Sequence, residues 1–136
     1  MIDSDRDHYT LLEHTADVKI RARGDSFALT LRHLAGGLFD ILYDAAPAGE
    51  KNRRTLSVEA WDRASLVVNF LNELLYWIEE ELIHPTAVNV LAVSDRGLTF
   101  ILEWQEAQTP PAYEIKAATY HDLVVEDHLI EVVFDL

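Results

Sequence analysis

The sequence contains no cysteine among its 136 residues, and this absence removes several kinds of chemistry at once. Disulfide bonds, zinc–thiolate sites, iron–sulfur clusters and cysteine nucleophiles all need a thiol. Long apolar runs are also missing, since no stretch approaches the roughly 20 residues that span a bilayer. The first ten residues, MIDSDRDHYT, lack the basic and apolar regions of a secretory signal. We therefore expect a cytoplasmic protein that does not associate with a membrane.

Basic residues are scarce, and most of them lie in the first half of the chain. Lys and Arg number 11 against 24 Asp and Glu, which gives a net charge of −13 at pH 7. Residues 64–136 contain thirteen acidic side chains and only two basic ones, Arg96 and Lys116. A surface this acidic repels phosphate backbones, so we expect no strong direct binding of nucleic acid. Cations and basic proteins are better suited as partners.

The apolar content is sufficient for one folded domain. Hydrophobic residues make up 49% of the chain, and no repeat or linker divides it, so we predict a single domain over residues 1–136. Residues 1–8 form an acidic tail that we expect to be flexible. Asp3, Asp5 and Asp7 have the spacing of the first ligands of a calcium loop. However, His8 and His14 stand where such a loop needs Gly and Glu, which favours a solvated tail.

Two amphipathic helices and several short strands are predicted. Apolar stripes indicate helices over residues 27–42, capped by Asp25 or Ser26, and over 64–81, capped by Asp62. Gly36 and Gly37 inside the first helix indicate close packing against a sheet, or a weak point. Residues 44–54 are predicted to be a loop. Strands are predicted at 9–13, 17–23, 55–60, 88–93, 98–104, 114–119 and 129–134, with a short one near 123–125. This order predicts an α+β fold, a two-layer sandwich of mostly antiparallel or mixed sheet with both helices on one face.

Polar residues at predicted strand ends are the candidates for a functional site. Asp17 is out of phase with the buried positions Val18 and Ile20, and Asp135 is out of phase with Val132 and Phe134. Lys116 and Tyr120 are predicted to share one face of the strand at 114–119. These side chains would meet if their strands are neighbours. The full candidate set is His14, Asp17, Lys116, Tyr120, His121, Asp135 and the terminal Leu136.

Each candidate also has a purely structural interpretation. His14 follows a strand and suits a hydrogen-bonded turn, and Asp17 suits a cap of the same turn. Lys116 suits an ordinary salt bridge, and a terminal Asp135 suits a solvent-facing position. The residues alone leave these alternatives open.

Four segments together resemble the archease family. They are LLEHTADV at 11–18, VVNFLNELLYWIEEE at 67–81, EIKAATYHDLVVE at 114–126 and VVFDL at 132–136. Their order and spacing extend the resemblance over almost the whole chain. One position departs from the family pattern, because Asp122 stands where members commonly have Gly.

The resemblance implies a fold in which one structural module is inserted into another of the same kind. It also implies a protein that is not itself an enzyme. Such a protein promotes guanylylation of an RtcB-type RNA ligase, using GTP and metal ions, and so supports repeated rounds of tRNA splicing or RNA repair. GTP and RNA would be met only through the ligase.

Carried over by motif, Asp17, Asp135 and the terminal carboxylate of Leu136 become metal ligands, and Lys116 becomes the functional lysine. Oxygen ligands suit a hard divalent cation, calcium first and magnesium or manganese as alternatives.

Two other functions stay open from the residues. One is a stand-alone metal-dependent phosphohydrolase with His14 or His121 as base, which would need more metal ligands than the sequence supplies. The other is a general chaperone-like binding module.

Overall fold

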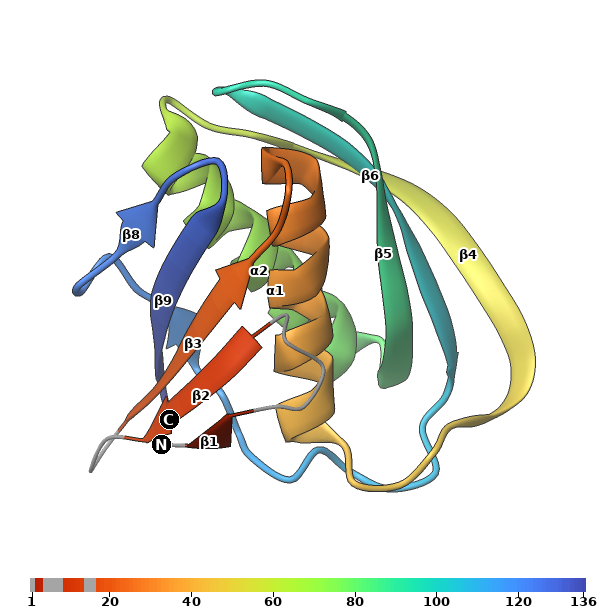
Figure 1. The fold of residues 1–136 in the computed structure, drawn as a ribbon. Helices are drawn as coiled ribbons and strands as arrows, with labels where there is room; N and C mark the ends of the chain where they lie inside the picture. The colour runs from red at the N-terminus through yellow and green to blue at the C-terminus, as the bar shows by residue number, and fades with distance from the viewer. Residues whose placement is uncertain (1, 4–8, 14–16) are drawn as a thin grey trace.

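The strands of this protein are arranged in two antiparallel sheets, and both helices lie between them (Figure 1). The computed structural model describes residues 2–3, 9–13 and 17–136. The first sheet contains β1 (Ile2–Asp3), β2 (Tyr9–Glu13), β3 (Asp17–Arg23), β7 (Ala117–Ala118), β8 (Val124–Val125) and β9 (Leu129–Asp135). The second contains β4 (Ala48–Glu59), β5 (Ile83–Val93) and β6 (Gly97–Glu106). The helices are α1 (Phe27–Leu42) and α2 (Arg63–Glu80).

The predicted fold class is confirmed. Every strand pair described is antiparallel, and two amphipathic helices supply much of the core. One detail differs from the prediction, because the strands divide into two sheets and the helices contact both. Helix α1 packs on β3 of the first sheet and on β5 of the second. Both helices therefore bury residues on more than one side.

The three-stranded sheet repeats the strand order of one part of the six-stranded sheet. In the second sheet the chain runs β4–α2–β5–β6, with β6 placed between β4 and β5. In the first it runs β3–α1–β8–β9, with β9 placed between β3 and β8. The second unit lies in the chain between α1 and β7. This arrangement is a module inserted into another of the same kind, as the resemblance implied.

The helices begin where their capping residues are placed. The Ser26 side chain accepts a hydrogen bond from the Leu29 backbone N–H at 3.1 Å, and Asp62 accepts one from Ser65 N–H at 2.8 Å. Both caps satisfy a backbone donor that the first turn would otherwise leave unpaired. The predicted stripe of α1 is buried along its length. Local sequence therefore determines where both helices start and which way they face.

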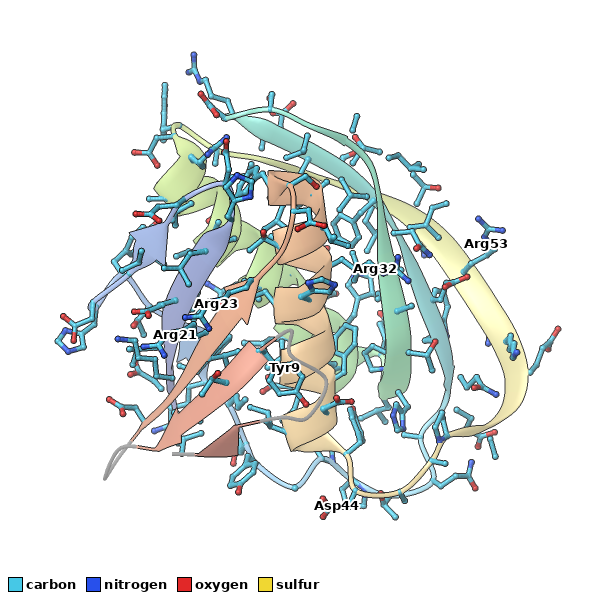
Figure 2. All side chains as sticks on the ribbon, viewed as in Figure 1. Tyr9, Arg21, Arg23, Arg32, Asp44 and Arg53 are labelled. Atoms are coloured by element: carbon cyan, nitrogen blue, oxygen red, sulfur yellow. The ribbon has the colours of Figure 1, made fainter. Side chains whose placement is uncertain are left out.

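Two predictions about loops and strands are wrong. Residues 48–54, predicted as part of a loop, belong to β4, where Arg53 and its neighbours are exposed (Figure 2). This half of β4 has no apolar alternation because neither face is buried, and its pairing with β6 makes it a strand. The strand predicted at 114–119 is only Ala117–Ala118, because only these two residues pair with the end of β9.

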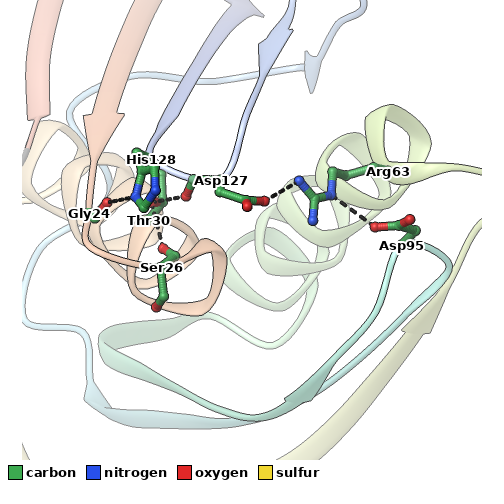
Figure 3. A network of polar contacts seen from close by, with 7 residues as sticks. All are labelled: Gly24, Ser26, Thr30, Arg63, Asp95, Asp127 and His128. Carbon is green, nitrogen blue, oxygen red and sulfur yellow. Dashed lines mark hydrogen bonds and ion pairs between the residues drawn. The ribbon is translucent and has the colours of Figure 1, made fainter.

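One arginine connects the two modules. Arg63 at the start of α2 contacts Asp127 in the β8–β9 turn at 2.5 Å and Asp95 in the β5–β6 turn at 3.1 Å (Figure 3). Its guanidinium also lies 4.1 Å from the centre of the Phe27 ring. Two further hydrogen bonds hold the β8–β9 turn in place. Thr30 Oγ1 of α1 donates to the Asp127 carbonyl, and His128 Nδ1 contacts the Gly24 carbonyl.

Within the described residues, no helix is long and apolar enough to cross a membrane. Of the segment 1–8, predicted as a flexible tail, Ile2–Asp3 is described as a short strand paired with β2. Residues 1 and 4–8 lie outside the described part of the chain.

Candidate functional site

The candidate site lies where β3 begins and β9 ends. Asp17 is the first residue of β3, Asp135 is the last of β9, and the two are direct partners across the antiparallel pair. On its other side Asp135 pairs with Ala117 of β7. The start of β3, near the beginning of the chain, therefore meets β7 and the end of β9, near its end, at one edge of the first sheet close to the carboxyl terminus (Figure 1).

The Asp17 and Asp135 side chains lie on the outer face of this sheet. Val18, Ile20 and Ala22 point into the core, so the alternate residues of β3 point away from the helices. Directly opposed residues of an antiparallel pair share a face, so Asp135 lies on the outer face with Asp17. The predicted phase of both residues is confirmed.

Two carboxylates opposite each other create a local excess of negative charge. Side chains in this arrangement have Cβ atoms about 4.5–5.5 Å apart, and like charges so placed destabilise a sheet. Asp17 is half-buried and Asp135 is exposed. The terminal carboxylate of Leu136 follows immediately, and the Leu136 side chain is 38% exposed. A cation bound between these groups would offset the repulsion.

The donor set fits a hard divalent cation. All the groups concerned are carboxylates, which bind calcium, magnesium and manganese in preference to softer metals. Among the described residues, no group of three or more His, Asp or Glu side chains is arranged to hold a metal ion. The two aspartates and the chain terminus would therefore supply part of a coordination shell, and water or a partner would supply the rest.

Lys116 is held beside Asp135 through its backbone. Its N–H donates to the Asp135 carbonyl at 2.9 Å, directly before β7 begins. Its side chain is exposed and makes no ion pair with the described residues. Among the described residues, no acidic side chain forms the salt bridge considered for Lys116. Its ammonium group is accessible at the same end of the sheet.

Tyr120 and His121 are not brought to the two aspartates. The chain bends after Thr119, so Tyr120 and Lys116 do not share a strand face as predicted. The Tyr120 hydroxyl lies 3.2 Å from Ser65 Oγ in the first turn of α2. His121 Nε2 lies 3.3 Å from an Asp122 carboxylate oxygen, with both side chains well exposed.

The backbone at Asp122 has a conformation that suits the glycine expected there from the resemblance. Its φ angle is +50°, in the left-handed region that glycine adopts freely and that Asp tolerates better than most residues. Asp122 can therefore occupy this turn position in place of glycine.

Sequence reasoning missed Glu131, which organises the same outer face. Its carboxylate forms ion pairs with Lys19 Nζ at 3.2 Å and with Arg21 Nε at 2.5 Å. Burial alone would raise the pKa of Glu131, but these two cations outweigh burial and lower it. The alternation of β9 was a usable signal, because Glu131 is in phase with Asp135. His14, a further candidate, lies outside the described residues.

Comparison with known proteins identifies the family. The model of the Archease protein family (MTH1598/TM1083) matches residues 9–136. The chain belongs to the archease family. It is 34% identical over 126 residues to Protein archease of Pyrococcus abyssi and 32% identical to that of Pyrococcus furiosus, covering 88% of this chain and 87% of each relative.

A solved structure agrees in fold. Protein 1598 of Methanobacterium thermoautotrophicum, known from its solution structure, superimposes with a TM-score of 0.66 at 26% identity. The match covers 96% of this chain and 99% of that protein. The inserted-module architecture described above is therefore shared by another protein over nearly its whole length.

Proposed function

We propose that this archease-family protein activates an RtcB-type RNA ligase. It would promote guanylylation of the ligase's active-site histidine from GTP and so support multiple turnovers in tRNA splicing or RNA repair. The observation that carries the proposal is the meeting of Asp17 and Asp135 as strand partners, with Lys116 fastened beside them, in a chain of this family.

In this proposal Asp17, Asp135 and the terminal carboxylate of Leu136 hold a divalent cation, calcium first and magnesium or manganese as alternatives. The bound ion supplies positive charge that can be directed at GTP phosphates. Lys116 presents a flexible ammonium group to the same phosphates, as lysines do in many phosphate sites. The incomplete coordination shell is what allows the ligase or its nucleotide to contribute the remaining ligands.

The acidity of the second half of the chain supports a basic protein as partner. Thirteen acidic and two basic residues after position 63 make this half a suitable surface for a positively charged, phosphate-binding active site. Exposed charges are screened by salt over about 10 Å at 0.1 M, so the association should weaken as salt rises through the physiological range.

The geometry of His121 does not suit it as the base of a stand-alone phosphohydrolase. Such an enzyme needs a base positioned at the metal. His121 faces Asp122 and is exposed, with 70% of its side-chain surface accessible. It lies on the bend that carries Tyr120 toward α2, not beside the two aspartates.

Multiple-turnover RNA ligation tests the proposal. An RtcB-type ligase from the same organism is incubated with excess RNA ends, GTP and Mn²⁺ or Mg²⁺, with and without this protein. We expect product to exceed the ligase concentration many-fold only when the protein is present. A ligase that turns over equally well without it would overturn the proposal. Turnover of phosphoesters by the protein alone would favour the phosphohydrolase, and stabilisation of many unrelated proteins would favour the chaperone-like module.

A further inference from the structure

An apolar cleft with an acidic rim opens at the C-terminal end of α2. It has a volume of about 350 Å³, which suits one or two side chains rather than a large ligand. We call it the α2 cleft. Its apolar lining comes from both helices and from the segment that follows β6: Leu42, Leu75, Ile78, Leu82, Pro111, Tyr113 and Ile115.

The rim of the α2 cleft is negatively charged. Glu79 and Glu114 line the cleft, and Glu80 and Glu81 follow Glu79 directly. All four glutamates are exposed, and none makes an ion pair with the described residues. The last turn of α2 contains no basic residue. Glutamates at this end oppose the helix dipole, so they lower helix stability and increase the negative potential of the cleft.

Leu82 breaks a second local rule at the same place. It follows the helix C-cap with φ +54°, a conformation in which glycine is usual. Its side chain is 75% exposed, so it adds little to the core. A strained, exposed leucine beside three helix-opposing glutamates is a cost that folding alone does not explain.

One wall of the α2 cleft is connected along the chain to the candidate site. The segment that forms one wall, residues 111–115, leads directly into Lys116, whose backbone binds Asp135. This wall is fixed to α1 through the hydrogen bond from Ala112 N–H to the Leu42 carbonyl at 2.6 Å. In Figure 1 the segment between β6 and β7 crosses the end of the molecule at which the carboxyl terminus lies.

We propose that the α2 cleft is a docking site for a basic segment of the ligase, in which an apolar side chain enters the cleft and flanking Lys or Arg residues contact the glutamate rim. The proposal rests on the proposed function and assigns the ligase a second contact, separate from the two aspartates. Charge complementarity determines the occupant, since the rim repels acidic segments and this half of the chain has only two basic residues of its own.

Titration calorimetry at 50 and 150 mM salt tests this contact by measuring how tightly the ligase binds the wild type, a cleft variant and a control variant. The first variant, Glu79→Gln/Glu114→Gln, removes rim charge while keeping shape; its matched control is Glu59→Gln/Glu126→Gln, two exposed glutamates outside the cleft. We expect the cleft variant to bind at least five-fold more weakly at 50 mM salt, with a smaller difference at 150 mM, and the control to bind like the wild type.

Leu82→Gly separates binding from folding. Glycine relieves the left-handed strain, so thermal stability should stay equal or rise while ligase binding falls at least five-fold. Leu91→Ala, at another exposed leucine (58% exposed), is the control and should bind normally. Equal binding by wild type, Leu82→Gly and the rim variant would overturn the docking site.

A peptide arm keeps this result distinct from the outcome for the proposed function. Fluorescence anisotropy compares a labelled peptide carrying Leu between Lys residues with the same peptide carrying Glu. We expect the wild type to bind the Lys peptide preferentially and both cleft variants to lose that preference. If the ligase is stimulated but neither peptide nor ligase binding depends on the cleft, the docking site is wrong and the proposed function stands. If the cleft binds the Lys peptide but the ligase does not bind or respond, the proposed function fails, and with it the ligase as the occupant.

Discussion

Asp17 and Asp135 are direct partners across β3 and β9, although they lie 118 positions apart in the sequence. Their carboxylates share the outer face of the first sheet, where like charges destabilise the pair. The divalent cation proposed for this site would offset that repulsion.

Arg63 should contribute to stability by holding the two modules together. It pairs with Asp95 of one module and Asp127 of the other and lies over Phe27. Because these groups are partly exposed, we expect Arg63→Met to lower the free energy of unfolding by only about 1 kcal/mol. Urea unfolding measures the change, which should shrink in 1 M NaCl. Arg53→Met on exposed β4 is the control, and an equal loss there would contradict the special role of Arg63.

The two neighbouring glycines of α1 should respond in opposite ways to alanine. A Cβ at Gly36 would meet no atom within 4 Å, whereas one at Gly37 would lie 2.9 Å from Cγ of the Tyr9 ring. Gly36→Ala should therefore raise the free energy of unfolding by about 1 kcal/mol through helix propensity. Gly37→Ala should lower it by about 1–2 kcal/mol, because the ring or the helix must shift. Thermal unfolding of the pair tests this, and an equal gain in both would show that the close packing is unimportant.

Replacing Asp122 with the family's glycine should leave function intact. The residue has φ +50°, so Asp122→Gly relieves backbone strain but removes the exposed contact with His121. We expect a gain in stability of less than about 1 kcal/mol. Stimulation of the ligase should be unchanged. Asp122→Val, which tolerates this backbone poorly, should be clearly less stable; if it unfolds at the same temperature as the wild type, the turn is not under strain.

His84 should make the protein less stable in mild acid. It is buried, stacks on Tyr43 with ring centres 3.9 Å apart, and burial lowers its pKa. In the unfolded chain a histidine takes up a proton near pH 6.5, whereas the folded protein resists protonation until a lower pH. Stability at neutral pH is therefore lost as pH falls below about 6.5.

Urea unfolding at pH 7.5, 6.5 and 5.5 measures this loss. His84→Phe keeps the ring stack and should reduce the loss between pH 6.5 and 5.5, while the exposed-site control His121→Gln should not. The same pH dependence in wild type and His84→Phe would exclude His84 as the cause.

The sequence predicts local features well and distant pairings poorly. Both helices lie within a residue of their predicted bounds, because the apolar stripes and the caps Ser26 and Asp62 are local signals. The hydropathy pattern does not predict a strand at residues 48–54, because this strand depends on pairing with β6 and not on burial.

The candidate site shows the same division. Alternation in β3 and β9 predicted that Asp17 and Asp135 avoid the core, but only the pairing of the two strands shows that they meet. The placement of Tyr120 toward Ser65 depends on a bend after Thr119 that the motif alone does not reveal.

Single-turnover guanylylation of the ligase tests the central claim most directly. The ligase is mixed with labelled GTP, metal and either wild type, Asp17→Asn, Asp135→Asn or the control Asp25→Asn, which changes an exposed aspartate outside the site. We predict that the wild type and Asp25→Asn accelerate label transfer equally, and that each site variant loses at least ten-fold of the acceleration while unfolding at or above the wild-type temperature. Full acceleration by Asp17→Asn and Asp135→Asn would contradict the account.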